Sequence, residues 1–146
     1  MVGKRREVQS VPSMSEAQAA ALAEHCPDLA QWPQRWEIDE DDIAMGERIV
    51  AFFTPFLLHL LDKGIARKTF RRHRDHLWLL GGELIGRRYE DDTLKKMPVG
   101  KAIDTLIEDE GGPLIWPRIT EAEQKSFDAT CRQLYKYLSP ADNSTR

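Results

Sequence analysis

Six basic side chains and one hydroxyl fall within a dozen consecutive positions near the middle of this chain. Arginine and lysine neutralise phosphate oxygens, a threonine hydroxyl donates a hydrogen bond to them, and the first amides of a helix add to the attraction. Within residues 66–76 only Asp75 opposes this charge. The spacing therefore predicts a surface that contacts DNA phosphates through a helix over residues 66–76. The predicted contact residues are Lys63, Arg67, Lys68, Thr69, Arg71, Arg72 and Arg74.

Two other interpretations account for the same residues. Basic helices are common on soluble proteins, and ion pairs with the acidic segments 37–42 or 90–92 would make this one a solvated face. The basic helix could instead dock on the acidic surface of a partner protein, which would make the chain an interaction module or a subunit. The formal net charge of -3 and a pI near 5.8 argue against a protein that coats nucleic acid with its whole surface.

Signatures of catalysis and of cofactor binding are missing from the sequence. It contains no G-x-S-x-G, P-loop, G-x-G-x-x-G or H-E-x-x-H motif, so we predict a protein that is not an enzyme and needs no cofactor. His73 and His76 could share a metal ion on one helix, but no Cys or further His lies nearby and the neighbouring arginines repel a cation. We therefore predict no metal site, with His73 half-buried and His76 exposed. We expect His59 to be a hydrogen-bonded core histidine and Cys131 a packed, inert thiol.

The most apolar part of the chain comes just before the basic helix. Residues 42–63 carry apolar side chains at almost every angle of a 3.6-residue period, which predicts a helix surrounded by others at the axis of the core. Pro55 lacks a backbone donor, so a kink or a restart is expected there. Gly64 supplies the positive φ that ends the helix. The acidic segment 37–42 is predicted to be a solvated cap at its start.

The basic helix is predicted to start near Ala66 and to bury one stripe of side chains. Gly81 and Gly82 lower its helix propensity, yet the apolar period runs through them. Because Gly82 and Gly86 form a G-x-x-x-G, we predict a continuous helix with a close neighbour at the glycines, while a break at Gly81 is the alternative. A homodimer through this face is compatible with the pattern. The stripe consists of Phe70, His73, Leu77, Leu80, Leu84 and Ile85.

Three further helices and three connectors, one of them the polar segment 86–97, account for the rest of the chain. Ser15 and Gln18 form a capping box for the first helix, and Thr120 and Glu123 form one for the last. Pro98 suits the first turn of a short amphipathic helix between them. The irregular segments before the central helix and before the last helix are predicted to lay large apolar side chains on the core. These side chains are Trp32, Trp36, Ile115 and Trp116.

Length and composition fit a single all-α domain, a bundle of about five helices. A chain of 146 residues has the usual size of one domain, and 41% hydrophobic and 31% charged residues are ordinary for a soluble protein. We predict a disordered arm over residues 1–14, a helical domain over 15–139 and a flexible tail over 140–146. No secretory signal or bilayer-length apolar run is evident, and the two cysteines are far apart, which predicts a cytoplasmic protein without membrane contact.

The residues around the turn before the basic helix have a recognisable order. An apolar helix is followed by Lys63-Gly64, Ile65, Lys68-Thr69, Phe70, His73 and Leu77. This order resembles the SAM-like core-binding domain of tyrosine recombinases and phage integrases, in which a turn of this kind leads into a DNA-facing helix. The resemblance covers roughly a quarter of the chain. It implies a SAM-like fold, with Lys68, Thr69, Arg71 and Arg72 at the positions that approach the DNA backbone.

The chain departs from that family in its catalytic half. The family's series of an arginine, His-x-x-Arg and a tyrosine is missing, and Tyr135 and Tyr137 are not embedded in one. The resemblance therefore implies no strand exchange. It implies a non-enzymatic DNA-binding accessory or regulatory protein, for example of a mobile element.

Overall fold

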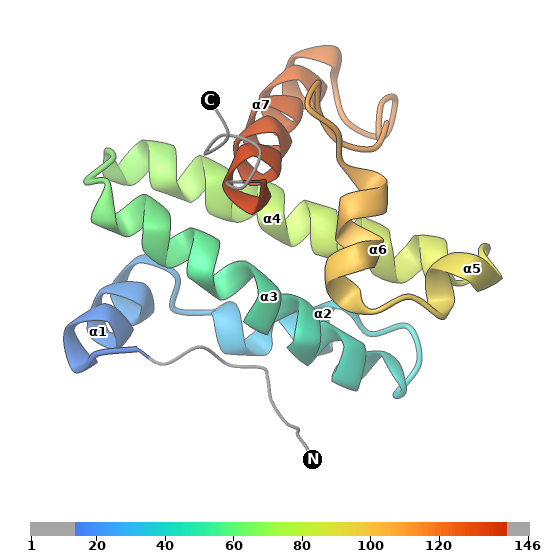
Figure 1. Ribbon diagram of the computed structural model, residues 1–146, viewed down its shortest axis with the longest axis horizontal. Coiled ribbons are helices and arrows are strands. Elements are labelled where there is room, and N and C mark those ends of the chain that lie inside the picture. Colours follow the sequence, from blue (N-terminus) through green and yellow to red (C-terminus); the bar gives the residue numbers. More distant parts are fainter. Residues whose placement is uncertain (1–13, 140–146) are drawn as a thin grey trace.

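The computed structural model describes residues 14–139, and within that range the chain forms helices and no strand. The predicted all-α class is confirmed. Residues 14–139 form seven α-helices instead of about five, because α2 and α5 are short helices in segments expected to be connectors. The predicted arm and tail lie, apart from Met14, outside the described residues. The elements are α1 (Glu16–His25), the 3-10 helix η1 (Leu29–Gln31), α2 (Trp32–Trp36), α3 (Asp42–Asp62), α4 (Arg67–Arg88), α5 (Asp92–Lys95), α6 (Val99–Leu106) and α7 (Glu121–Leu138) (Figure 1).

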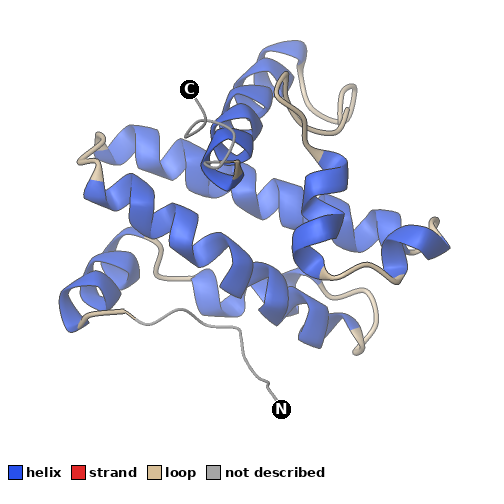
Figure 2. Ribbon diagram, viewed as in Figure 1, coloured by secondary structure: helices blue, strands red, loops and turns tan. Residues whose placement is uncertain are grey.

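The two longest helices, α3 and α4, form an antiparallel pair around which the others pack. Gly64 turns the chain between them with φ of 69°, as predicted. The helices α1 and α2 pack on α3 from one side and α6 packs on it from the other, while α7 crosses α4 (Figure 1). Loops join the helices, and the longest of them within the described residues, over 107–120, connects α6 to α7 (Figure 2). The basic residues after Gly64 therefore lie at one end of the pair, and the carboxyl end of α4 lies at the other.

The helix α3 is the axis of the core, as its apolar pattern predicted. Ile49, Phe53, Phe56 and Leu57 are at most 1% exposed, which means that neighbours cover this helix on several sides. The helix runs through Pro55 without a restart, and the hydroxyl of Thr54 donates to the carbonyl of Val50 at 2.7 Å. By length and composition alone α3 could also cross a membrane, but core helices of soluble proteins pass the same test, and 50% of its most apolar window is buried.

The Trp36 indole packs against Gly81 and Gly82 of α4. The helix is continuous from Arg67 to Arg88, and a Cβ added at Gly81 would lie 2.6 Å from Cη2 of the Trp36 indole. The indole Nε1 donates to the carbonyl of Trp78 at 2.9 Å. The predicted close neighbour is thus a side chain of α2, and the alternative of a broken helix is wrong. Around Gly86 a Cβ would meet nothing within 4 Å.

Both predicted capping boxes are present, but the loop before α7 differs from the expectation. Gln124 organises this loop: its Oε1 accepts from the amides of Ile115 and Trp116 at 2.8 and 2.9 Å, and its Nε2 donates to the carbonyl of Pro113. Ile115 is buried as predicted, whereas Trp116 is 47% exposed. Successive side chains of an extended segment point to opposite sides, so only one of this pair reaches the core.

Candidate functional site

The predicted phosphate-binding residues surround the turn between α3 and α4. Lys63 is the C-cap of α3, and the remaining six occupy the first turns of α4. Phe70 and His73 point into the core and fix the rotation of the helix, so Lys68, Arg71 and Arg72 face solvent. Thr69 is half-buried.

Two of the seven predicted residues are held by partners within the chain. The guanidinium of Arg67 pairs with Glu24 of α1 at 2.9 Å, which lowers the pKa of that carboxyl. Arg74 pairs with the neighbouring Asp75 at 3.0 Å and donates to the carbonyl of His25 at 3.1 Å. Their positive charge is therefore partly compensated, and Arg74 is only 21% exposed at its side chain. The docking of α1 makes these two residues less available to phosphates than the sequence suggested.

The other four cations have no such partner among the residues that the structure describes. Lys63, Lys68, Arg71 and Arg72 are exposed, and none forms an ion pair with another described residue. We call them the basic cluster. The acidic segments 37–42 and 90–92 form no ion pair with it within the described part of the chain. One of their residues, Asp42, instead engages the opposite end of α4.

Asp42 is buried, contrary to the expectation that the whole segment 37–42 is solvated. Its Oδ2 accepts from the amides of Ile38 and Asp39 at 3.0 and 2.9 Å and from the hydroxyl of Tyr89 at 2.6 Å, and Arg88 lies 3.9 Å from its Oδ1. Burial opposes ionisation of Asp42, but these hydrogen bonds outweigh it and lower its pKa. The hydrogen bond from its hydroxyl to Asp42 raises the pKa of Tyr89 to about 12. This carboxylate thus fastens the loop before α3 to the end of α4.

A polar cluster joins α4 to α7 beneath the basic cluster. The hydroxyl of Thr130, itself 1% exposed, lies 2.7 Å from Nδ1 of both His73 and His76. Burial, with the charges of Arg72, His76 and Lys63, lowers the pKa of His73 to about 4, and burial also lowers that of His76. The prediction of a half-buried His73 and an exposed His76 is therefore wrong, since His73 is buried and His76 half-buried. The sequence signal that was missed is Thr130, three residues after the core residue Phe127.

The remaining reactive side chains offer little chemistry. His59 is exposed and its ring centroid lies 4.9 Å from that of Tyr137, so it is not the core histidine that was expected. Cys26 and Cys131 are buried, and burial raises the pKa of each thiol to about 12. Within residues 14–139 no group of three or more His, Cys, Asp or Glu side chains is placed to hold a metal ion.

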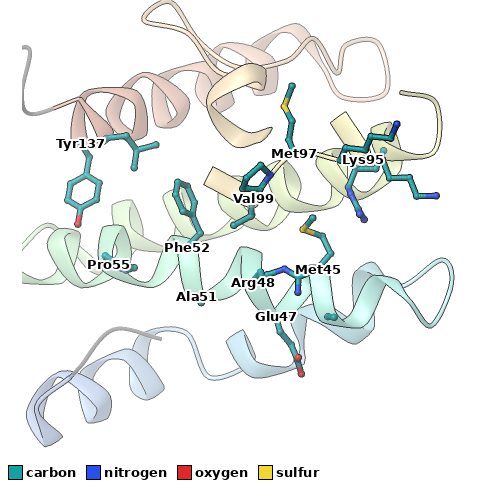
Figure 3. Close-up of a pocket in the computed structure, with 15 residues that line it drawn as sticks. Met45, Glu47, Arg48, Ala51, Phe52, Pro55, Lys95, Met97, Val99 and Tyr137 are labelled. Carbon is teal, nitrogen blue, oxygen red and sulfur yellow. The ribbon is translucent and has the colours of Figure 1, made fainter. Parts of the chain in front are cut away.

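A second surface, which the sequence did not predict, is an open groove of about 1150 Å³. The helix α3 forms one wall, and the segment from α5 to α6 together with the last residues of α7 forms the other. We call it the α3–α7 groove. Phe52, Met97 and Val99 line its middle, with Lys95 toward one end and Tyr137 toward the other (Figure 3). The signal in the sequence was the pair Lys95-Lys96 directly before an apolar stretch, but only the fold shows that α3 completes the surface.

Comparisons with known protein families, with curated proteins and with solved structures found no match for this chain. Function must therefore be inferred from the chain's own residues and their arrangement.

Proposed function

We propose that this protein binds DNA without catalysis, through phosphate contacts made by the basic cluster. The observation that carries the proposal is the grouping of four exposed cations at one end of the α3–α4 pair, none with an ion-pair partner among the described residues. Like charges held close together repel one another, and a polyanion relieves that repulsion while releasing its own counterions.

The start of α4 adds hydrogen-bond donors to this charge. Its N-cap residue, Ala66, has no side-chain group to cap the helix, and its first turn contains no acidic residue. The first amides of a helix lack partners within the helix and favour an anion. A DNA phosphate beside Lys68 and Thr69 would supply the missing acceptor. Arg67 and Arg74 would add longer-range attraction while keeping their contacts with Glu24 and Asp75.

The resemblance to the core-binding domain of tyrosine recombinases agrees with this proposal. It assigns DNA-backbone contacts to Lys68, Thr69, Arg71 and Arg72, three of which belong to the basic cluster. Because the family's catalytic residues are missing from the sequence, the role we propose is that of a cytoplasmic accessory or regulatory protein, for example of a mobile element. Neither a metal ion nor a cofactor is needed for such a role.

The dependence of DNA affinity on salt tests the proposal. If the four cations of the basic cluster each neutralise one phosphate, log K should fall with log[salt] with a slope of about -3.6, and non-specific Kd at physiological salt should be about 10⁻⁴ to 10⁻⁶ M. Replacing Arg71 and Arg72 together by alanine should lessen the slope by about 2 and weaken binding to all DNA sequences alike. Fluorescence anisotropy with a labelled duplex measures both quantities.

A matched control changes the same charge elsewhere. Lys101 and Lys125 are exposed residues outside the basic cluster, so their double alanine variant should retain nearly the full slope. Absence of duplex binding even at low salt would contradict the proposal. If Arg71→Ala with Arg72→Ala then abolished co-purification with a protein, the alternative function, docking on an acidic partner, would replace it.

A further inference from the structure

The α3–α7 groove has the length and the apolar floor of a site for a helix. Its α3 wall includes Ala44, Arg48, Ala51 and Pro55, whose spacing of three and four places them on one face. From Ala44 to Pro55 the wall extends roughly 16 Å, about three helical turns. Phe52, Met97 and Val99 are only half-buried by the chain itself, so apolar surface remains available in the groove. An open channel of this shape accommodates the ridge of a helix.

The charged side chains around the groove are predominantly basic. Arg48, Arg88, Lys95 and Lys96 line it, and among the described residues Glu47 is the only acidic one that does. Figure 3 shows Glu47 directed to the side of α3 away from Met97 and Val99. The groove therefore combines an apolar floor with an excess of positive charge.

Arg88, one of the residues that line the groove, has an incompletely satisfied guanidinium. Its side chain is 15% exposed and its Nε is buried without a hydrogen-bond acceptor among the described residues. Its closest carboxylate oxygen, on Asp42, is 3.9 Å away, and the other oxygen of Asp42 already accepts three hydrogen bonds. A guanidinium has five N–H donors, and leaving a buried donor unpaired is unfavourable.

We propose that the α3–α7 groove binds an acidic amphipathic helix of a partner protein. Apolar side chains of that helix, spaced by three and four residues, would cover Phe52, Met97 and Val99. Its carboxylates would face Arg48, Lys95 and Lys96, and one of them would approach Arg88. This site is distinct from the basic cluster and does not depend on DNA binding.

The chain's own undescribed segments are poor occupants by composition. Residues 1–13 bring three basic residues against the single acidic Glu7, so their charge repels the groove. Residues 140–146 bring one acidic residue, Asp142, and no large apolar side chain to cover the floor. A DNA backbone matches the cations but leaves the apolar floor uncovered. An acidic amphipathic helix matches both the positive charge and the apolar floor of the groove.

A designed peptide provides the test. The probe is a fluorescein-labelled peptide of about 14 residues, roughly four turns, with leucines spaced by three and four and glutamates elsewhere. The full-length protein should bind it saturably in fluorescence anisotropy. The same peptide with lysine in place of every glutamate should bind at least tenfold more weakly. Because Lys95 and Lys96 are exposed, Lys95→Glu with Lys96→Glu should retain the circular dichroism spectrum and weaken the glutamate peptide at least tenfold.

Control variants separate the groove from other surfaces. Lys101→Glu with Lys125→Glu makes the same charge change outside the groove and should leave peptide affinity within about twofold. Arg71→Ala with Arg72→Ala should also leave it unchanged. If that variant removes peptide binding instead, the basic cluster binds the peptide and the proposal is overturned. It is likewise overturned if a fatty acid, dodecanoate, binds the groove while the peptide does not. It is also overturned if the protein forms a dimer through the groove and Lys95→Glu with Lys96→Glu converts that dimer to monomers.

Discussion

Thr130 places one hydroxyl between the rings of His73 and His76. A hydroxyl has one hydrogen, so it can donate to one imidazole while it accepts from the other. Neutral rings suit this arrangement. A protonated His73 would place a charge in the buried contact between α4 and α7, which is unfavourable. The lowered pKa of His73, at about 4, follows from this burial and from the nearby cations.

The first prediction concerns stability and pH. The pKa of His73 is about 4 in the folded state and about 6.5 in the unfolded state, so the unfolded chain binds more protons between these values. The free energy of unfolding should therefore fall as pH drops from about 6.5 to 4, by roughly 3 kcal/mol from this residue. Denaturant unfolding at a series of pH values measures the loss. Carboxylates with lowered pKa values stabilise the fold when ionised, and this contribution to the free energy of unfolding is lost at the acid end of the window and below.

Two glutamine variants assign this effect to the buried ring. Glutamine at position 73 does not titrate and can still bond to Thr130, so His73→Gln should reduce the dependence between pH 6.5 and 4 and leave the part that comes from His76, whose pKa burial also lowers. His59→Gln, at an exposed position, should leave it unchanged. An unaltered dependence in His73→Gln would show that another group titrates in this window.

A second prediction uses two glycines of the same helix that have different neighbours. Gly81→Ala would bring Cβ within 2.6 Å of Cη2 of Trp36, and overpacking of this kind costs about 1 to 3 kcal/mol, more than the gain of about 1 in helix propensity. Gly86→Ala meets open space, so it should stabilise the protein by up to about 1 kcal/mol. Urea unfolding of both variants measures the difference. Equal effects would mean that Trp36 does not rest on Gly81.

The helices differ in what stabilises them. Both α1 and α7 carry capping boxes that satisfy their first amides locally. The short α2 and α5 span 5 and 4 residues, too few for a helix to be stable alone, and depend on buried side chains such as Trp36 and Leu94. The long α3 depends on burial of its apolar side chains by the surrounding helices.

A third prediction tests the role of α3 as the core axis. Phe56 is 1% exposed, and Phe56→Ala should lower the free energy of unfolding by roughly 3 to 5 kcal/mol because it opens a cavity. Ile38 is 66% exposed, and Ile38→Ala should change the same quantity by less than about 0.5 kcal/mol. Chemical denaturation compares the two. A loss below about 1 kcal/mol for Phe56→Ala would place the axis of the core elsewhere.

Across the whole molecule, basic residues gather on two surfaces despite the net charge of -3. The basic cluster lies at the α3–α4 turn, whereas Asp42, Tyr89 and Arg88 join the opposite ends of the same two helices. The α3–α7 groove carries its own basic residues near that second end. Two separated basic surfaces on one compact fold would allow the protein to hold DNA at one and a partner helix at the other.

The sequence alone determined the all-α class, the central helix, both capping boxes and the buried stripe of α4. These features depend on residues close together in the chain, through the 3.6-residue period and local hydrogen bonds. The sequence also located the basic cluster, because Lys68, Arg71 and Arg72 must lie opposite that stripe.

Only the tertiary structure decided which of the predicted cations pair with another described residue. Arg67 is paired because α1 brings Glu24 beside it, and the two residues are 43 positions apart in the chain. Residues far apart in the chain also meet where Thr130 lies between the histidines and where Trp36 packs on Gly81. The walls of the α3–α7 groove likewise come from distant segments. Local periodicity determines which face of a helix is buried. Which side chain of another helix meets that face depends on how all the helices pack together, and no local pattern in the sequence records it.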